Sequence, residues 1–274
     1  MSAHAQSRPG AAGLLLIGAA VVASLLLIGV PVALIFSFAL REGVGAYVAN
    51  ILEPNTRHAI WLTALTALIV VPINIVFGIC AAWLVTRFRF RGRSLLLTAI
   101  ELPFSVSPIV AGVCYLFLYG AQGLFGPALM DAGIQIMFTV FAIFLVSLFV
   151  TAPYVARELI PLMQQQGGED EEAALSLGAN GWQLFWNVTL PNIRWALLYG
   201  AILCNARVMG EFGAVSVVSG AIRGQTNTLP LQISLLFNDF NVAGAFAAAS
   251  ILTFAALLTI VAKSLVGLKQ GPAD

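Results

Sequence analysis

Long apolar segments separated by short polar ones follow one another along the chain, and this pattern predicts helices that cross a lipid bilayer. A helix needs about 20 apolar residues to cross the hydrocarbon layer. Six segments are long enough, and they cover roughly residues 12–40, 59–86, 94–119, 134–156, 193–218 and 240–262. We therefore predict an all-α integral membrane protein with six transmembrane helices.

Polar residues divide the chain into three parts. We assign residues 1–57 to the first transmembrane helix and an outer loop, residues 58–265 to the main membrane domain, and residues 266–274 to a cytoplasmic tail. Within the main domain, glycine and proline interrupt residues 120–130. Because these residues break regular helices, we expect a loop or a short helix there, at the outer surface.

One amphipathic segment, residues 169–191, lies between the fourth and fifth predicted spans. It opens with four acidic residues, 169–172, which favour a helix start because the first amide groups of a helix are unpaired. The small residues Ala173 and Ala174 then begin an apolar helical face. Gly178 tolerates unusual backbone angles and ends this helix. A second short amphipathic stretch follows, so the segment predicts a pair of short helices.

The composition indicates a chain whose solvent is partly lipid. Hydrophobic residues make up 60% of the 274 residues and charged residues only 9%, whereas soluble domains carry about 25% charged residues. The net charge is +1, so the chain lacks the basic surface that nucleic-acid binding requires.

The distribution of lysine and arginine predicts the side of each loop, because cytoplasmic loops carry an excess of these residues. Four arginines follow the second predicted span within seven residues. If that side is cytoplasmic, so are both termini and residues 169–191. Nine basic residues are then cytoplasmic, namely Arg8, Arg87, Arg89, Arg91, Arg93, Arg157, Arg194, Lys263 and Lys269, and three are outside, namely Arg41, Arg57 and Arg223.

Residues suited to metal binding or catalysis are few and scattered. Cys80, Cys114 and Cys204 fall inside apolar spans without metal-ligand spacing, and we interpret them as small buried hydrophobic residues. His4 and His58 are isolated. A membrane enzyme would need such groups clustered near one surface, so we expect neither a metal site nor a catalytic residue.

The chain also lacks a phosphate-binding loop, which requires Lys followed by Ser or Thr after a glycine-rich turn. Its two lysines, Lys263 and Lys269, follow Ala262 and Leu268. If transport depends on ATP, another subunit must hydrolyse it.

Residues 169–191 resemble the cytoplasmic coupling loop of the permease subunits of binding-protein-dependent ABC importers. That family carries Glu-Ala-Ala, three residues, Gly, nine residues, Ile, one residue and Leu-Pro. The matching residues here are Glu172, Ala173, Ala174, Gly178, Val188, Leu190 and Pro191. Val188 in place of Ile is the single departure.

The resemblance implies the type I importer permease fold, with a pair of coupling helices between transmembrane helices 4 and 5 that docks in a groove of an ATPase subunit. Without the motif spacing, the same residues would be interpreted as an ordinary amphipathic cytoplasmic loop.

Arg207 and Glu211 are charged residues inside the fifth predicted span, where Gly200, Gly210 and Gly213 leave room for close helix packing. A charge near the bilayer centre costs about 2.5–3.5 kcal/mol, but two residues four apart on a helix can face the same side and pair. The pair has two interpretations. It borders the translocation path, with Arg207 offsetting the charge of an anion, or it is a structural ion pair that fixes the fifth helix to a neighbour.

Glu101 is a further acid at membrane depth. Pro103 and Pro108 follow it, which implies a bent helix with freed carbonyl groups that can form a hinge or line a cavity. Glu101 is thus a candidate gate residue. Alternatively, it lies at the cytoplasmic interface and pairs with an arginine of residues 87–93.

Two stretches narrow the resemblance to the oxyanion branch of these importers, which serves sulfate, thiosulfate, molybdate and tungstate. They are residues 101–112 and 206–214. The outer segment, residues 217–230, is especially similar to the second of the two sulfate permease subunits. It includes Arg223, Thr226 and Asn227.

The resemblance implies a permease subunit of the bacterial inner membrane that translocates sulfate or thiosulfate. Its implied partners are a second homologous permease, an ATPase dimer that binds ATP and Mg²⁺, and a periplasmic anion-binding protein. This chain would bind no cofactor itself. One alternative is a molybdate or tungstate importer. Another is an ion-gradient-driven secondary transporter, which would be expected to show several paired acids at mid-membrane.

Overall fold

The computed structural model describes residues 11–269, and no strand occurs in this range. His4, Arg8 and residues 270–274 of the predicted tail lie outside the described residues. The helices are α1 (Ala11–Ser24), the π-helical turn η1 (Leu25–Gly29), α2 (Val30–Ala39), α3 (Val44–Leu52), α4 (Pro54–Arg87), α5 (Arg93–Ser105), α6 (Pro108–Tyr119), α7 (Gly126–Asp131), α8 (Val140–Thr151), α9 (Pro153–Gln166), α10 (Glu169–Ser176), α11 (Gly181–Leu184), the π-helical turn η2 (Phe185–Thr189), α12 (Leu190–Met209), α13 (Gly213–Val218), α14 (Leu229–Asn238) and α15 (Val242–Lys269).

Four helical runs within residues 11–269 are long and apolar enough to span a membrane: Gly13–Ala39, Pro54–Arg87, Val140–Gln166 and Val242–Gly267. The bent pair α5–α6 can supply a fifth span. α12 has 20 residues but contains more polar side chains, and it packs beside α4, α9 and α15. With α12 counted, the arrangement has the six passes expected of the fold.

Two of the predicted spans are broken: the bend in the third confirms the prediction made from Pro103 and Pro108, whereas the break in the fifth was not predicted. α5 and α6 meet at an angle of 109°, because Pro108 disfavours the helical conformation at the residue before it. Within the fifth predicted span, α12 ends at Met209, and α13 begins only at Gly213. Glu211 therefore lies in a break between two helices.

The bounds of the fourth span were also predicted incorrectly. The helix begins at Val140, six residues after the predicted start, and continues to Gln166, ten residues beyond the predicted end. The prediction was based on apolarity, but residues 134–139 are mostly apolar without being helical, and the polar end of α9 extends the helix beyond the apolar run. α7 confirms a short helix within residues 120–130, whereas α14 was not predicted.

Proline sets where several of these helices begin. It occupies the first or second position of α2, α4, α6, α7, α9, α12 and α14. Proline lacks an amide hydrogen, but this costs little in the first turn of a helix, because the amides of that turn have no acceptor within the helix. Pro54 and Pro108 also follow the ends of α3 and α5, whereas the helical runs Gly13–Ala39 and Val140–Gln166 continue across Pro31 and Pro153.

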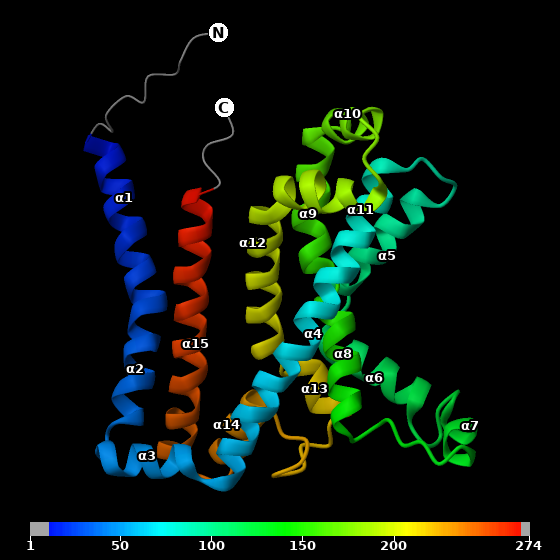
Figure 1. Cartoon of the computed structure of the whole chain (residues 1–274). Coiled ribbons are helices and arrows are strands. Elements are labelled where there is room, and N and C mark those ends of the chain that lie inside the picture. The colour runs from blue at the N-terminus through cyan, green and yellow to red at the C-terminus, as the bar shows by residue number, and fades with distance from the viewer. Residues whose placement is uncertain (1–10, 270–274) are drawn as a thin grey trace.

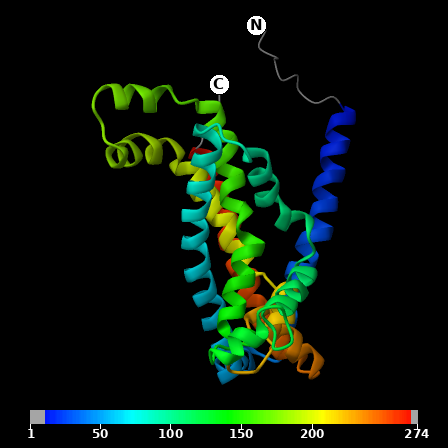
Figure 2. The same cartoon turned by 90° about the vertical axis from the view of Figure 1, so that its right-hand side faces the viewer.

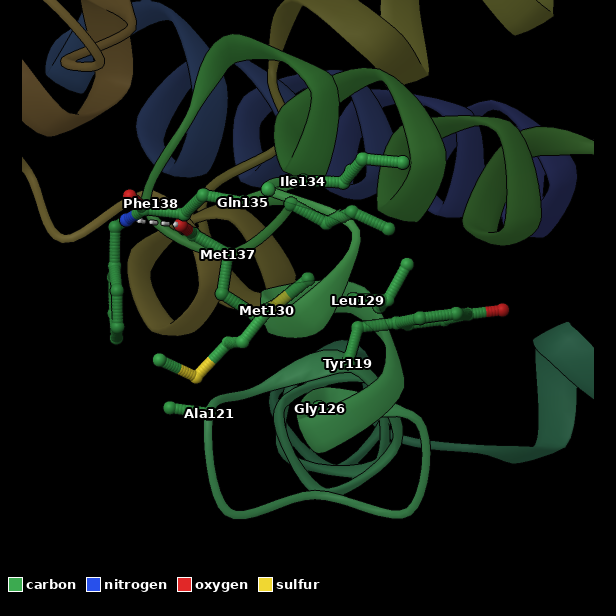
Figure 3. Close-up of a pocket in the computed structure, with 11 residues that line it drawn as sticks. Tyr119, Ala121, Gly126, Leu129, Met130, Ile134, Gln135, Met137 and Phe138 are labelled. Carbon is green, nitrogen blue, oxygen red and sulfur yellow. Dashed lines mark hydrogen bonds between the residues drawn. The ribbon is translucent and has the colours of Figure 1, made fainter.

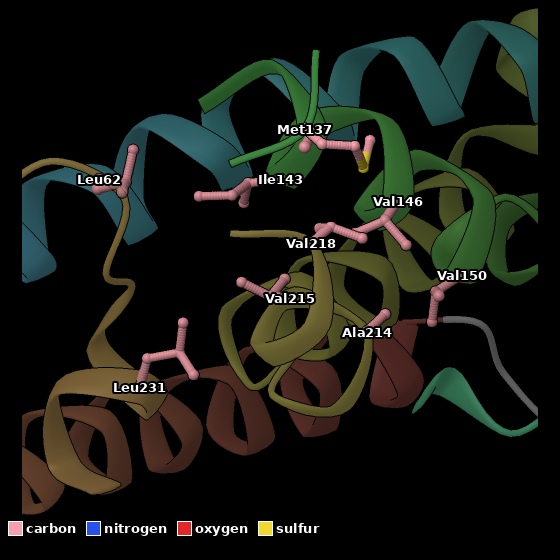
Figure 4. Packing of buried hydrophobic residues seen from close by; sticks show 10 residues of the cluster. Leu62, Met137, Ile143, Val146, Val150, Ala214, Val215, Val218 and Leu231 are labelled. Carbon is pink, nitrogen blue, oxygen red and sulfur yellow. The ribbon is translucent and has the colours of Figure 1, made fainter. Parts of the chain in front are cut away.

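Two large hydrophobic clusters and a smaller one around Ala81, Ile100 and Ala156 hold the bundle together. Figure 4 shows the first, where side chains of α4, α8, α13 and α14 meet, among them Leu62, Ile143, Val215 and Leu231. The second joins α4, α9 and α12 around Val70, Leu159 and other buried residues.

Glycines bring α9 close to α4 and α12. A Cβ atom at Gly78 of α4 would lie 2.6 Å from Cβ of Val155, and one at Gly200 of α12 would lie 3.2 Å from Cα of the same residue. Small residues allow such close approach between membrane helices. The prediction that Gly200 serves close packing is thus confirmed.

Asn74 is a buried polar residue in the middle of α4. Its Nδ2 donates to the Thr151 hydroxyl (2.6 Å) and lies 3.6 Å from Sγ of Cys204, so it joins α4, α8 and α12. Cys204 is buried as predicted, but Cys80 and Cys114 are exposed. The burial prediction was wrong for these two because their helices present them away from the bundle.

The two ends of the bundle carry different elements. Figure 1 shows that α1 begins and α15 ends at the same end as α10 and α11, while α3, α7 and α14 lie at the opposite end. Figure 2 shows the α10–α11 pair extending sideways from its end of the bundle.

The first helical run packs little against the rest of the chain. In the apolar window of Gly13–Ala39, no residue is buried, and Leu15, Leu16 and Leu27 are largely exposed. α15 contacts α2 and α3. The first run therefore needs lipid or another subunit to cover it.

Candidate functional site

The coupling loop, residues 169–191, is built from two helices with well-defined ends. α10 carries four acids in its first turn. Gly178 follows α10 with φ +88°, its amide donates to O of Leu175, and the amide of Ala179 donates to O of Ala174. These two bonds form a Schellman motif, which favours glycine at the left-handed position. Gly178 therefore sets the direction in which the chain leaves α10.

A capping box begins the second helix of the loop. Oδ1 of Asn180 accepts from the amide of Gln183 (2.8 Å), and Oε1 of Gln183 accepts from the amide of Asn180 (3.0 Å). Reciprocal bonds of this kind satisfy amides at a helix start. The turn between α10 and α11 is consequently fixed by local hydrogen bonds at both of its ends.

The coupling loop exposes large apolar side chains. Leu177 is 89% exposed, Trp182 71% and Trp186 49%. The two tryptophan rings lie 5.7 Å apart at 71°, which is a favourable edge-to-face arrangement. An apolar surface of this kind marks an interaction site.

The residues matching the family motif occupy this exposed loop. Glu172, Ala173, Gly178 and Pro191 are exposed, whereas Ala174, Val188 and Leu190 are half-buried. The small side chains of α10 therefore leave its backbone accessible to another protein surface.

The base of the coupling loop is held by an ion pair that the sequence did not indicate. Nε and Nη2 of Arg87 donate to the two carboxylate oxygens of Glu171 (2.8 and 3.2 Å), and the Thr189 hydroxyl donates to Oε1 of Glu171 (3.1 Å). Glu171 adjoins the motif residue Glu172 but points inward. The sequence alone does not indicate which of the four consecutive acids is buried.

The break after α12 contains the predicted ion pair. Nη1 of Arg207 lies 2.5 Å from Oε2 of Glu211, and the side chains are 28% and 1% exposed. Oε1 of Glu211 accepts from the amide of Ala214 (2.9 Å). The pairing of these residues is confirmed, and the carboxylate also supports the start of α13.

α13 is pressed against α6. A Cβ at Gly112 would lie 2.8 Å from O of Ala214, and one at Gly213 would lie 3.2 Å from Cβ of Pro108. The Glu211 break and the α5–α6 bend therefore lie on neighbouring segments. Figure 1 shows α13 between the two ends of the bundle, and Glu211 lies two residues before α13.

Glu101 does not pair as one prediction expected. It is exposed and forms no ion pair or side-chain hydrogen bond within residues 11–269. The arginines of the α4–α5 turn have other partners or none: Arg87 binds Glu171, and Arg93 donates to O of Val85. The prediction that Glu101 pairs with an arginine of residues 87–93 is therefore wrong.

The outer segment, residues 217–230, is held by a buried hydrogen-bond network. Oδ1 of Asn227 accepts from the amide of Gly224, and its Nδ2 donates to Gln232, which in turn donates to Thr56 of α4. The Thr226 hydroxyl donates to O of Ser219 (2.6 Å). Thr226 and Asn227 thus position the segment.

Arg223, in contrast, is exposed and pairs with Asp239. This ion pair joins the outer segment to the end of α14.

A pocket of about 380 Å³ lies at the end of the bundle opposite the coupling loop. Figure 3 shows side chains of Leu129, Met130, Ile134 and Met137 around it. None of the residues that line it is charged, so it does not suit a free anion. Within the described residues no group of three or more His, Cys, Asp or Glu could hold a metal ion.

A family model described as "Binding-protein-dependent transport system inner membrane component" matches residues 74–268. This range covers well over half of the chain. The chain belongs to this permease family. In the permease, the match includes both the coupling loop and the Arg207–Glu211 pair, while α1–α3 lie before it.

Curated relatives and a solved structure agree with this assignment. The permease is 54% identical to the sulfate transport system permease protein CysW of Escherichia coli K12, over 92% of this chain and 86% of that one. It is 37% identical to CysT of the same organism, over 77% and 76%. The crystal structure of a bacterial ABC transporter that imports alginate shares the fold, with a TM-score of 0.73 over 92% of this chain and 94% of that one, at 14% identity.

Proposed function

We propose that this permease is a membrane-spanning subunit of an ATP-driven importer that translocates sulfate or thiosulfate. The observation that carries the proposal is the 54% identity to a sulfate permease along nearly the whole chain. Identity of that extent, over both the membrane helices and the outer segment, favours a shared cargo.

The energy for transport is proposed to come from an ATPase dimer that binds ATP and Mg²⁺. This chain carries no phosphate-binding loop, and its coupling loop exposes Leu177, Trp182 and Trp186. An apolar groove on the ATPase would cover these side chains, and Glu172 would lie at the edge of the contact.

The proposed location is the bacterial inner membrane, with the coupling loop and both termini in the cytoplasm. The first residues of α1 and the last of α15 lie at the coupling-loop end in Figure 1, and the excess of arginine at that end favours the cytoplasmic side. ATP is available in that compartment.

Two further partners belong to the proposal. A second, homologous permease would cover the unburied face of α1 and α2 and complete a path between the two chains. A periplasmic protein would deliver the anion to the end that carries α3, α7 and α14. Such a protein would supply the selectivity, which fits the small number of basic residues in the membrane helices, of which Arg207 is one.

The proposed mechanism starts from movement of the coupling loop. Closure of the ATPase dimer by ATP would move the coupling loops together and tilt the helices attached to them, opening the path outward. Arg207 is partly exposed beside the helix break, so it can offset the charge of a passing anion. Glu101 is exposed near the α5–α6 bend and is the candidate gate residue.

Measurements of anion uptake test this proposal. In proteoliposomes that hold the complete complex with the ATPase facing the lumen, labelled sulfate should accumulate only when the lumen contains ATP. Unlabelled sulfate or thiosulfate should compete with the labelled sulfate better than molybdate does. Preferential competition by molybdate or tungstate would instead assign the permease to those anions. Uptake by this chain alone, driven by an ion gradient, would contradict the proposal altogether.

A further inference from the structure

The coupling loop projects from the bundle and is held at its base by few side chains. Figure 2 shows α10 and α11 extending sideways, away from the other helices. η2 continues directly into α12, so one end of the loop is joined to the bundle by the chain itself, whereas α4 meets the loop through side chains. The side-chain contacts at the base therefore decide whether a push on the loop also reaches α4.

Arg87, Glu171 and Thr189 form that junction, here called the loop anchor. Arg87 is the last residue of α4, Glu171 lies in the first turn of α10, and Thr189 ends η2. Besides its two bonds to Glu171, Arg87 donates through Nη1 to O of Met163 in α9 (3.0 Å). One guanidinium thus joins α4, α9 and α10.

The loop anchor is tightly closed and poorly accessible to water. The Arg87 and Glu171 side chains are 16% and 11% exposed, and Thr189 is buried. The cavity beside them measures only about 10 Å³. A bidentate arginine–carboxylate pair has a fixed geometry that lysine cannot reproduce, so the anchor fixes orientation as well as distance.

Two neighbouring residues, Glu169 and Arg89, carry the same charged groups but lack the contacts of the loop anchor. Glu169 and Arg89 are exposed and form no ion pair or side-chain hydrogen bond within residues 11–269. They carry the same charges and lie two residues away from Glu171 and Arg87, but they have neither the burial nor the partners of that pair. Variants at Glu169 and Arg89 therefore test the effect of charge at this end of the protein separately from the effect of the loop anchor.

We infer that the loop anchor is the joint through which movement of the coupling loop reaches α4, and that Arg87 and Glu171 are positioning residues for coupling ATP hydrolysis to transport. The inference rests on the proposed function. The exposed surface of the loop binds the ATPase, whereas the buried anchor passes the displacement to α4 and α9. The two tasks are thus divided between Glu172 and Glu171, which are adjacent in sequence.

The test uses the complete complex in proteoliposomes, with binding protein and labelled sulfate, and measures uptake and phosphate release in the same sample. Arg87→Lys and Glu171→Gln should lower the sulfate taken up per ATP hydrolysed about tenfold or more. The ATPase should still co-purify in normal amount, since the exposed apolar surface is unchanged. Arg89→Lys and Glu169→Gln are the matched controls and should leave the ratio unchanged.

Two results would overturn the inference. One is an unchanged ratio of uptake to hydrolysis in both anchor variants. The other is loss of ATPase co-purification in them, which would show that the anchor merely supports the folding of the loop. If the unaltered complex neither hydrolyses ATP nor takes up sulfate, the proposed function fails instead, and the measurement on the unaltered complex distinguishes this from failure of the inference.

Discussion

Glu211 is a buried carboxylate with a different partner on each oxygen, Arg207 on one and the amide of Ala214 on the other. This arrangement reconciles the two interpretations of the pair. Glu211 is structural, since its side chain is almost inaccessible, while Arg207 is partly exposed and can also meet an anion.

Arg207→Gln should therefore destabilise the protein, because it leaves the buried Glu211 charge without its partner, at a cost of about 3 kcal/mol. The double variant Arg207→Gln/Glu211→Gln should recover most of this stability, since a neutral amide side chain in place of Glu211 retains an acceptor for Ala214. Thermal unfolding in detergent measures both effects. If the assembled double variant takes up sulfate at the normal rate, Arg207 has no role in the path.

Gly178 has a backbone conformation that other residues rarely adopt. Gly178→Ala should destabilise the coupling loop by about 1–2 kcal/mol and weaken co-purification of the ATPase. Gly181→Ala is the matched control, because a Cβ at either position has open space but only Gly178 has a positive φ. Equal binding of the ATPase by both variants would show that the loop direction does not matter.

Among the elements, α4 links the two functional ends of the permease. Its last residue, Arg87, belongs to the loop anchor, and near its start Thr56 and Thr63 bind the network that positions the outer segment. Asn74 joins its middle to α8 and α12. A displacement of α4 at the coupling loop would thus reach the outer segment through hydrogen bonds and packed side chains.

The start of α4 depends on Glu53. Burial raises the pKa of this carboxyl, but hydrogen bonds from the amide and hydroxyl of Thr56 and from Asn55 outweigh burial and lower the pKa below its ordinary 4.5. The stabilisation is therefore present above pH 4.5 and is lost as the pH falls through the lower folded-state pKa.

Glu53→Gln should accordingly lower the unfolding temperature at neutral pH and have little effect at a pH well below 4.5. Glu42→Gln provides the control, since Glu42 is exposed and forms no ion pair or side-chain hydrogen bond within the described part of the chain. A destabilisation by Glu53→Gln that is independent of pH would contradict the role of the charge.

The whole molecule places the coupling loop and the outer segment at opposite ends of the bundle. In a chain without its native cysteines, Gln225→Cys should react with a membrane-impermeant maleimide added outside intact cells, and Ser176→Cys should not. Inverted vesicles should show the opposite pattern. Labelling of Ser176→Cys from outside would exclude a cytoplasmic coupling loop and with it the proposed ATPase contact.

Much of this arrangement was predictable from the sequence. Long apolar runs predicted membrane helices because lipid leaves backbone polar groups no partner except each other. The motif from Glu172 to Pro191 predicted a pair of short helices, and the spacing of Arg207 and Glu211 predicted an ion pair. These features depend on residues close together in the chain.

Features that depend on distant residues were not predictable in this way. Pro103 and Pro108 predicted the bend between α5 and α6, but apolarity could not locate the end of α12, because the apolar run continues from α12 into α13. Only the fold brings Arg87 to Glu171, 84 residues away, and Asn227 to a network that reaches Thr56.

The sequence by itself determined the membrane environment, the family and the exposed coupling loop, because apolar length and local motif spacing suffice for each. The tertiary structure alone decided which of four consecutive acids is buried, which helices glycine brings together, and how the coupling loop is joined to α4. Those choices depend on the position of each side chain relative to helices that are remote in the sequence, and a one-dimensional pattern does not record that position.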